Sequence, residues 1–148
     1  MNTFQVSQGA LARGYAATYQ GRVARACLAI NPGSLTVDST TADWDAAEIT
    51  GQAGYGYSRV IWTLPAGAYS GGDGFFKGQV QNVTFQANGS PQGLQYNSLY
   101  LVTGTVSGGV TTWATYIEQL YTFSPTVALA SGEPQTYPTY LLVDEFTV

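Results

Sequence analysis

Three acidic residues, Asp43, Asp45 and Glu48, cluster in one short segment of the sequence. Carboxylates on a loop can bind calcium, and two of them can act as acid and base in glycoside hydrolysis. A tryptophan beside acids, here Trp44, is also typical of a sugar site. The glycine spacing of a calcium loop is missing, however. We therefore interpret residues 40–47 as a solvated loop with Trp44 packed inward.

Two further segments contain residues that could do chemistry, and both have simpler explanations. The glycines of residues 70–74 permit positive φ and could let a ligand approach the backbone, but a tight surface loop explains them equally well. Asp144 and Glu145 are neighbours in a strand-like run, so their side chains point to opposite faces and form no catalytic pair. They would instead protect an exposed edge from unwanted pairing.

Arg59 is the charged residue with the clearest structural meaning, because it stands in the most hydrophobic strand candidate, residues 57–64. A buried arginine must be paired. Arg59 is therefore either an exposed strand residue or the partner of an acid such as Asp43 or Asp45. Such an ion pair would fix a loop or a subunit contact.

The composition excludes many catalytic mechanisms. The 148 residues include no histidine, one cysteine and one lysine. Without histidine there is no Ser-His or Cys-His pair, and one cysteine allows neither an intrachain disulfide nor a cysteine-cluster zinc site. Cys27 lies in an apolar run and is interpreted as a small buried hydrophobe. We expect no enzyme activity, no cofactor and no bound metal.

The balance of charge and aromatic residues points to an assembly. Charged residues make up 9% of the chain, against about 25% in an ordinary soluble domain, and aromatic residues make up 14%. Interface cores have this composition, so we expect neighbouring subunits to cover much of the surface. The alternative is an uncharged polar surface kept soluble by hydroxyls and amides. The net charge of −4 argues against nucleic acid as a partner, and we expect no membrane partner.

The chain divides into residues 1–20, an N-terminal arm, and residues 21–148, a single domain. In the arm, Ser7 could cap a short helix that its two glycines weaken. We interpret the arm as a short helix or a segment that a partner orders; a poorly ordered terminus is the simpler alternative.

About eight short strand candidates fill the domain, separated by Gly, Pro and Asn turn signals. This pattern predicts an all-β fold, an antiparallel β-sandwich of jelly-roll type. Polar and apolar residues alternate in residues 79–87, so Val83 and Phe85 should face the core. The candidates are residues 23–30, 35–37, 57–64, 79–87, 98–105, 110–123, 126–130 and 140–148.

Several motifs form a pattern with a known counterpart. Gly-Tyr-Gly-Tyr-Ser-Arg at residues 54–59 follows Glu-Ile-Thr-Gly at residues 48–51, and Val-Thr-Phe-Gln-Ala-Asn-Gly-Ser and Leu-Tyr-Leu-Val-Thr-Gly come later. The pattern resembles a group of small β-rich bacteriophage virion structural proteins, in which a Gly-Gly-Tyr-Ala-Arg element corresponds to residues 54–59 and follows a Glu-hydrophobic-x-Gly stretch. The resemblance covers about half of the chain. The early part of this chain lacks the group's opening helix, and the residues after Gly109 have no match in the group.

This resemblance implies a virion component, assembled in the host cytoplasm and without catalytic residues. The expected role is that of a head decoration (cement) protein, a homotrimer that binds the major capsid protein or other virion proteins and stabilises the lattice. A tail, collar or baseplate subunit is the alternative within this class. Tyr57 and Arg59 would then anchor a strand. The residues predicted to form interfaces are Phe4, Val6, Leu11, Arg13, Tyr15, Tyr19, Tyr57 and Arg59.

Two other classes of function remain open at this point. A carbohydrate-binding β-sandwich module would stack Trp44, Trp62 and Trp113 on sugar rings, which requires the three rings to be exposed along one face. An enzyme would act through the carboxylates of Asp43 and Asp45.

Overall fold

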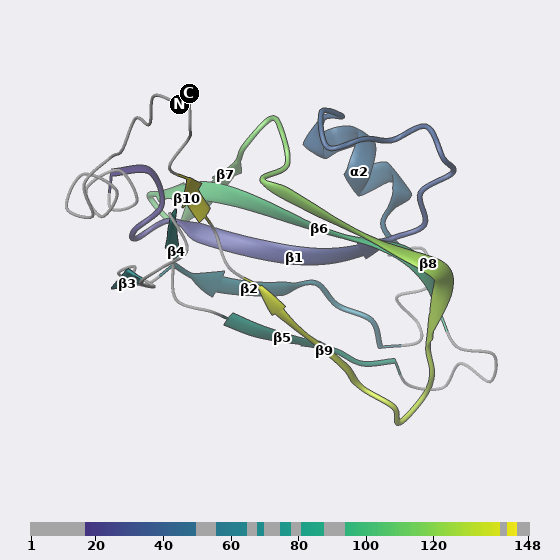
Figure 1. The fold of residues 1–148 in the computed structure, drawn as a ribbon. Coiled ribbons are helices and arrows are strands. Elements are labelled where there is room, and N and C mark those ends of the chain that lie inside the picture. Colours follow the sequence, from purple (N-terminus) through teal and green to yellow (C-terminus); the bar gives the residue numbers. More distant parts are fainter. Residues whose placement is uncertain are drawn as a thin grey trace, which may run out of the picture.

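The computed structural model has an all-β architecture with one short helix (Figure 1), which confirms the predicted antiparallel, sandwich-like class. The strands described here pair into a five-stranded, a three-stranded and a two-stranded sheet. The structure describes residues 17–49, 56–64, 68–69, 75–77, 81–87, 94–139 and 142–144.

The five-stranded sheet is organised around its longest strand, β6. One edge of β6 pairs with β1, and β2 flanks β1 on the outside. The other edge of β6 pairs with β8 along its first half and with β7 along its last residues. All of these pairs are antiparallel. The strands are β1 (Val23–Ala29), β2 (Val60–Thr63), β6 (Leu94–Ser107), β7 (Val110–Trp113) and β8 (Gln119–Leu129).

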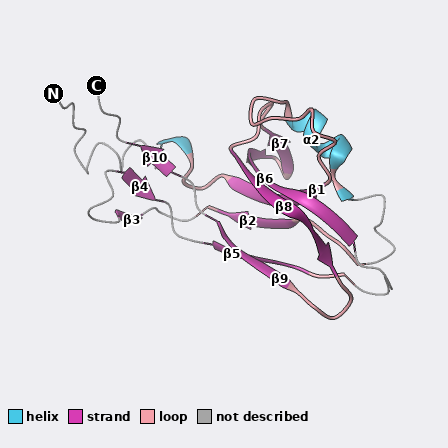
Figure 2. Ribbon diagram, turned by 45° about the vertical axis from the view of Figure 1, so that its right-hand side comes forward, coloured by secondary structure: helices cyan, strands magenta, loops and turns pink. Residues whose placement is uncertain are grey.

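Two smaller sheets complete the strand content. The ribbon of β5 (Gln81–Phe85) and β9 (Gln135–Thr139) lies on one face of the large sheet, opposite the helix α2 (Thr41–Ala47) (Figure 1). A three-stranded sheet of β3 (Ala68–Tyr69), β4 (Phe75–Lys77) and β10 (Leu142–Asp144) is set to one side of the main body (Figure 2).

Because the large sheet is covered on both faces, its central strands are buried on both sides and read as nearly continuous apolar runs. On the face toward the β5–β9 ribbon, Leu28 and Leu99 pack with Phe85. On the face toward α2, Cys27 and Tyr100 pack with Trp44. Each of these side chains is 1% exposed or less. Val83 and Phe85 do face the core, as the alternation predicts.

The helix α2 corrects the interpretation of residues 40–47 as a loop. Thr40 and Asp43 form a capping box, in which each side chain accepts a hydrogen bond from the other's backbone N–H. Trp44 packs inward as expected, fully buried, and its indole N–H donates to the Thr36 carbonyl at 3.0 Å. The sequence analysis did not recognise Thr40 and Asp43 as a capping box, because the clustered acids suggested a solvated loop.

Three strand predictions also need correction. Residues 35–37 form no strand, and the candidate 110–123 divides into β7 and the start of β8. The candidate 126–130 continues β8, which crosses Pro125 where its register on β6 shifts. The strands β3, β4 and β9 have no counterpart among the candidates, and Pro138 lowers the strand propensity of β9. The 70–74 segment and Glu145 lie outside the described residues.

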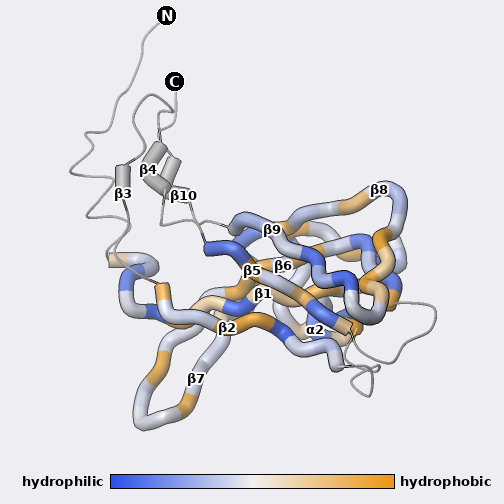
Figure 3. The backbone as a smooth tube through the Cα atoms, turned by 90° about the horizontal axis from the view of Figure 1, so that it is seen from below, coloured by the Kyte–Doolittle hydropathy of each residue, from blue (hydrophilic) through white to orange (hydrophobic). Residues whose placement is uncertain are grey.

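The strands β6 and β7 form a hairpin that projects from the body (Figure 3). Gly108 and Gly109 connect the strands, and both have positive φ, 57° and 79°. A two-residue turn of this kind matches the twist of the strands it joins. From Thr105 to Val110 every residue of the hairpin is exposed.

Gly104, at the base of this hairpin, is expected to tolerate no side chain. A Cβ there would lie 2.8 Å from the Thr112 carbonyl oxygen and 2.9 Å from the Trp113 ring. The first of these is backbone and cannot move aside cheaply. Gly104→Ala should therefore lower the free energy of unfolding by about 2 kcal/mol, the cost typical of overpacking. Chemical denaturation measures this loss of stability. The control is Ser107→Ala, an exposed position on the same hairpin. Gly33→Ala is not suitable as a control, because Gly33 has a positive φ of 102°. Equal stabilities of the two variants would contradict this prediction.

Candidate functional site

The acidic cluster does not form one site, because each of its carboxylates has a different structural partner. Asp43 caps α2. Asp45 binds Arg25 on β1, and Glu48 binds Arg59 before β2. Of the two alternatives for Arg59, the structure shows the ion pair, with Glu48 as its partner rather than Asp43 or Asp45. This division leaves no free pair of carboxylates in the cluster for acid–base chemistry.

The first ion pair joins the large sheet to α2. The Arg25 guanidinium donates to both carboxylate oxygens of Asp45, at 3.0 and 2.8 Å. The Tyr100 hydroxyl donates to the same carboxylate at 2.8 Å. Arg25 is 1% exposed and lies 4.7 Å from the centre of the Trp113 ring, a cation–π contact. This cluster fixes α2 on the face of β1 and β6.

The second ion pair lies beside the edge of β1 that β2 does not cover, beyond the pairing of Ala26 with Val60. The Glu48 side chain is fully buried and accepts hydrogen bonds from the Arg59 guanidinium and the Tyr57 hydroxyl. The Tyr57 hydroxyl in turn accepts the Leu28 backbone N–H at 2.9 Å. Because β2 pairs with β1 only as far as Ala26, this hydroxyl satisfies a backbone donor that no strand reaches. Tyr57 and Arg59 thus act as strand anchors.

Burial changes the proton affinity of the groups beneath these ion pairs. Burial, with a smaller contribution from the Glu48 carboxylate, raises the pKa of Cys27 to about 12. Burial also raises the pKa of Tyr57 and of Tyr100 well above the ordinary value, with the neighbouring thiol and carboxylates adding to the effect. A thiol held protonated is a poor nucleophile. Cys27 is therefore a packing residue in this structure.

These shifts predict that the protein loses stability in alkali. Above the ordinary cysteine and tyrosine values, 9.0 and 10.0, the unfolded chain releases protons that the native chain retains. The free energy of unfolding should then fall as pH rises above about 9, by at most about 1.4 kcal/mol per pH unit for each group. Urea unfolding at pH 8 to 11 measures the slope, and Cys27→Ala should reduce it. A flat profile over this range would contradict the prediction.

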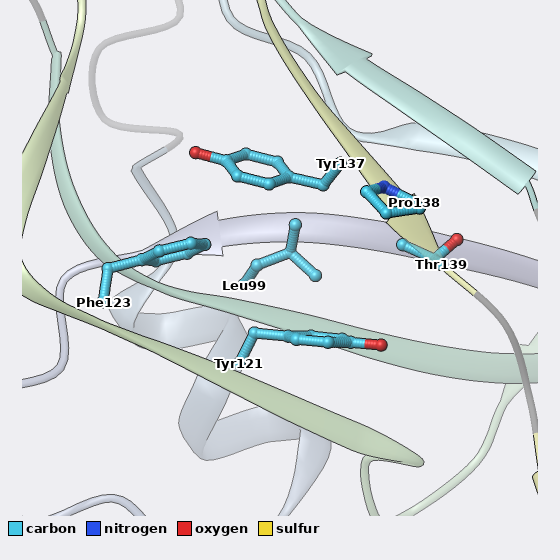
Figure 4. Close-up of a pocket in the computed structure, with 6 residues that line it drawn as sticks. All are labelled: Leu99, Tyr121, Phe123, Tyr137, Pro138 and Thr139. Carbon is cyan, nitrogen blue, oxygen red and sulfur yellow. The ribbon is translucent and has the colours of Figure 1, made fainter.

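An apolar cavity of about 220 Å³ lies between β8 and β9. Leu99 lies between the rings of Tyr121 and Tyr137, with Pro138 and Thr139 on one side (Figure 4). The hydroxyls of Tyr137 and Tyr96 form a hydrogen bond with each other. Phe123 also lines the cavity, and the described residues of the cavity lining include no charged side chain.

Large apolar side chains are also exposed outside this cavity. Val110 is 66% and Val106 is 53% exposed, and both lie at the end of the β6–β7 hairpin. Ile61, 55% exposed, lies on the edge strand β2. Between Lys77 and Glu118 the sequence has no charged residue at all. The projecting hairpin therefore presents an uncharged surface with apolar side chains.

The three tryptophans do not form an exposed line of rings. Trp44 is fully buried, and Trp62 and Trp113 are half-buried against the two cores. A sugar ring could not stack along them. The described residues hold no group of three or more potential metal-binding side chains.

The residues predicted to form interfaces have different placements. Tyr57 is buried in the core, and Arg59 is partly exposed. Tyr19 is half-buried, and its hydroxyl donates to Glu118 at 3.3 Å. Glu118 also accepts from Thr103, so the base of the arm is held against the large sheet. Ala17 and Thr18 are helical. The remaining predicted residues, Phe4, Val6, Leu11, Arg13 and Tyr15, lie outside the described part of the chain.

Sequence reasoning did not single out two features of the structure, the buried Arg25 and the exposed valines of the hairpin. The role of Arg25 depends on Asp45, twenty positions away in the sequence, so no local pattern reveals it. The exposed valines of the hairpin flank a Ser-Gly-Gly turn signal in the sequence, but their exposure depends on where the hairpin projects.

Comparison with protein-family models, with curated proteins and with solved structures found no match to the chain. Within the described residues, no helix is long and apolar enough to cross a membrane.

Proposed function

We propose that the chain is a bacteriophage virion structural protein, a capsid decoration (cement) protein that stabilises the head lattice by burying surface against its neighbours. The observation that carries the proposal is the uncharged, exposed surface around Val106 and Val110. The two valines lie on opposite faces of a hairpin whose tip residues, 105–110, are all exposed, so a partner can bury this tip without burying a charge. The resemblance of residues 47–64 and 80–103 to phage structural proteins supports the choice of assembly.

The internal use of the charged side chains also supports a structural role. Arg25, Asp45, Glu48 and Arg59 are the charges closest to the core, and all four are paired within the chain. Pairing of this kind stabilises the fold, and the paired groups are not available to bind a substrate. A subunit that acts by contact alone requires such a rigid body and a surface to bind with.

The N-terminal arm is proposed to add a second contact. Tyr19 and Gly21 attach its base to the large sheet, through Glu118 and through the Leu64 carbonyl at 3.0 Å. The arm would leave the domain from a fixed point and reach a neighbouring subunit. Repeated weak contacts of this kind give a lattice high avidity.

The test is the presence of the chain in purified particles of the phage that encodes it. We expect mass spectrometry to find it in stoichiometric amounts and antibody labelling to place it at regular positions over the head. Labelling confined to the tail, collar or baseplate would replace the decoration role with the alternative in the same class. Absence from washed particles would overturn the proposal.

A carbohydrate-binding module has less support, because the three tryptophans are buried or half-buried rather than aligned on the surface. The carboxylate enzyme has less support for a related reason: Asp43 caps a helix and Asp45 is bound to Arg25.

A further inference from the structure

The β6–β7 hairpin has the properties of a protruding contact element. Its end is exposed on both faces, because Val106 lies opposite Thr111 and Val110 lies opposite Ser107 in neighbouring pairs of the ladder. Successive pairs in a ladder point to opposite sides, so the two valines point to opposite faces of the hairpin. Both are more than half exposed. The side chains near the tip carry no charge that would resist burial.

The cavity between β8 and β9 has the complementary properties. Among the described residues, β8 pairs only with β6 and β9 only with β5, and the cavity lies between these two strands. An apolar cavity of about 150 Å³ is large enough for a benzene ring, so one of about 220 Å³ accepts a valine side chain. Pro138 at its rim is exposed and has no N–H to donate. The cavity therefore favours inserted side chains over a continued ladder on β9.

The hairpin of one chain cannot fill the cavity of the same chain. Leu99 at the floor of the cavity and Val106 near the tip both belong to β6. Seven residues of extended strand separate them, which is about 23 Å at 3.3 Å per residue. Because both belong to one rigid strand, no bending of a loop can bring them together.

We propose that the tip of the β6–β7 hairpin, through Val110, inserts into the β8–β9 cavity of a second copy of this chain. The inserted surface and the receiving surface are different patches, so the contact runs head to tail. A head-to-tail contact that closes after three copies gives a ring, which is the trimer that a threefold lattice position requires. The inference rests on the proposed assembly role and specifies how the copies join.

The experiment uses two variants that each damage one side of the contact. Val110→Asp places a charge on the inserted side chain, and Pro138→Glu places one at the rim of the cavity. Gln95→Glu adds the same charge at an exposed position on β6 and serves as the control for charge alone. Pro138→Ala removes the proline ring without adding charge. Sedimentation velocity measures the association of each protein, and circular dichroism verifies its fold.

We expect the wild-type chain, Gln95→Glu and Pro138→Ala to form the same oligomer. Val110→Asp and Pro138→Glu alone should each raise the dissociation constant about 30-fold or more, as loss of a central contact residue does. Mixed in equal amounts, the two variants should form a one-to-one complex, because each supplies the surface that the other lacks. If Val110→Asp does not fold, Val110→Ser takes its place in the mixture.

Two results would overturn the inference. One is a Val110→Asp chain that associates as tightly as the wild type, and the other is a mixture in which the two variants do not bind each other. Either result leaves the proposed function standing if the chain is found on phage particles, since the particle test does not depend on how copies join. Absence from particles with a positive mixing result would retain the self-contact and reject the virion role.

Discussion

Replacing Asp45 with asparagine is expected to lower the free energy of unfolding by about 3–5 kcal/mol, the usual cost of leaving one member of a buried ion pair without its partner. The uncompensated charge would be that of Arg25, which is 1% exposed. Its Nε already has no hydrogen-bond partner among the described residues. For a domain of this size the melting temperature should fall by roughly 6–20 °C.

The same ion pair should respond differently when the arginine is replaced. Arg25→Met removes the buried charge and leaves an apolar chain of similar length beside Trp113. The remaining Asp45 carboxylate is 35% exposed, so water can solvate it, and Tyr100 still donates to it. We expect less than half the loss caused by Asp45→Asn. Urea unfolding of both variants measures the asymmetry. A larger loss for Arg25→Met would show that Arg25 contributes by attraction to Asp45 more than its burial costs.

Replacing Glu48 with glutamine is expected to have the second-largest effect, a loss of about 3 kcal/mol. Glutamine has nearly the same shape, but it exchanges a carboxylate oxygen for an NH₂ group. Tyr57 and Arg59 both direct donors at this position, so one donor would face another. The loss lies at the lower end of the range for buried pairs, because the Arg59 side chain is 34% exposed and can turn to water.

Glu133→Gln is the matched control for this substitution. Glu133 is exposed, so the same chemical change there should alter stability by less than about 0.5 kcal/mol. Thermal unfolding of the two variants side by side gives the comparison. Equal melting temperatures would show that the Glu48 carboxylate does not hold the edge of β1.

The parts of the fold that local sequence patterns specify were predictable. The alternation around Val83 and Phe85 reports a strand with one buried face, and both side chains lie in the core. The apolar run around Cys27 reports burial on both faces of β1. In each case the pattern is a direct consequence of which faces are covered, so it can be read without knowledge of the partner strands.

Other parts depend on contacts between distant segments, and local patterns did not reveal them. The helix α2 is short and acidic, and its burial depends on the contact between Trp44 and Tyr100 of β6. Pro138 lowers the strand propensity of β9, so the sequence did not predict this strand, and its pairing with β5 determines its position. An ion pair at Arg59 was one of two alternatives, and its partner Glu48 lies eleven positions away, where no local pattern identifies it. The prediction of an interface at Tyr57 rests on a residue that the structure places in the core.

Light scattering on the purified full-length chain tests the central claim most directly, because a subunit that works by burying surface should assemble with its own kind. The proposed role predicts a defined oligomer with the mass of three 15.7 kDa chains, maintained on dilution to micromolar concentrations. A monomer at every concentration tested would contradict the account, since the exposed surface of the hairpin would then have no second copy to cover it.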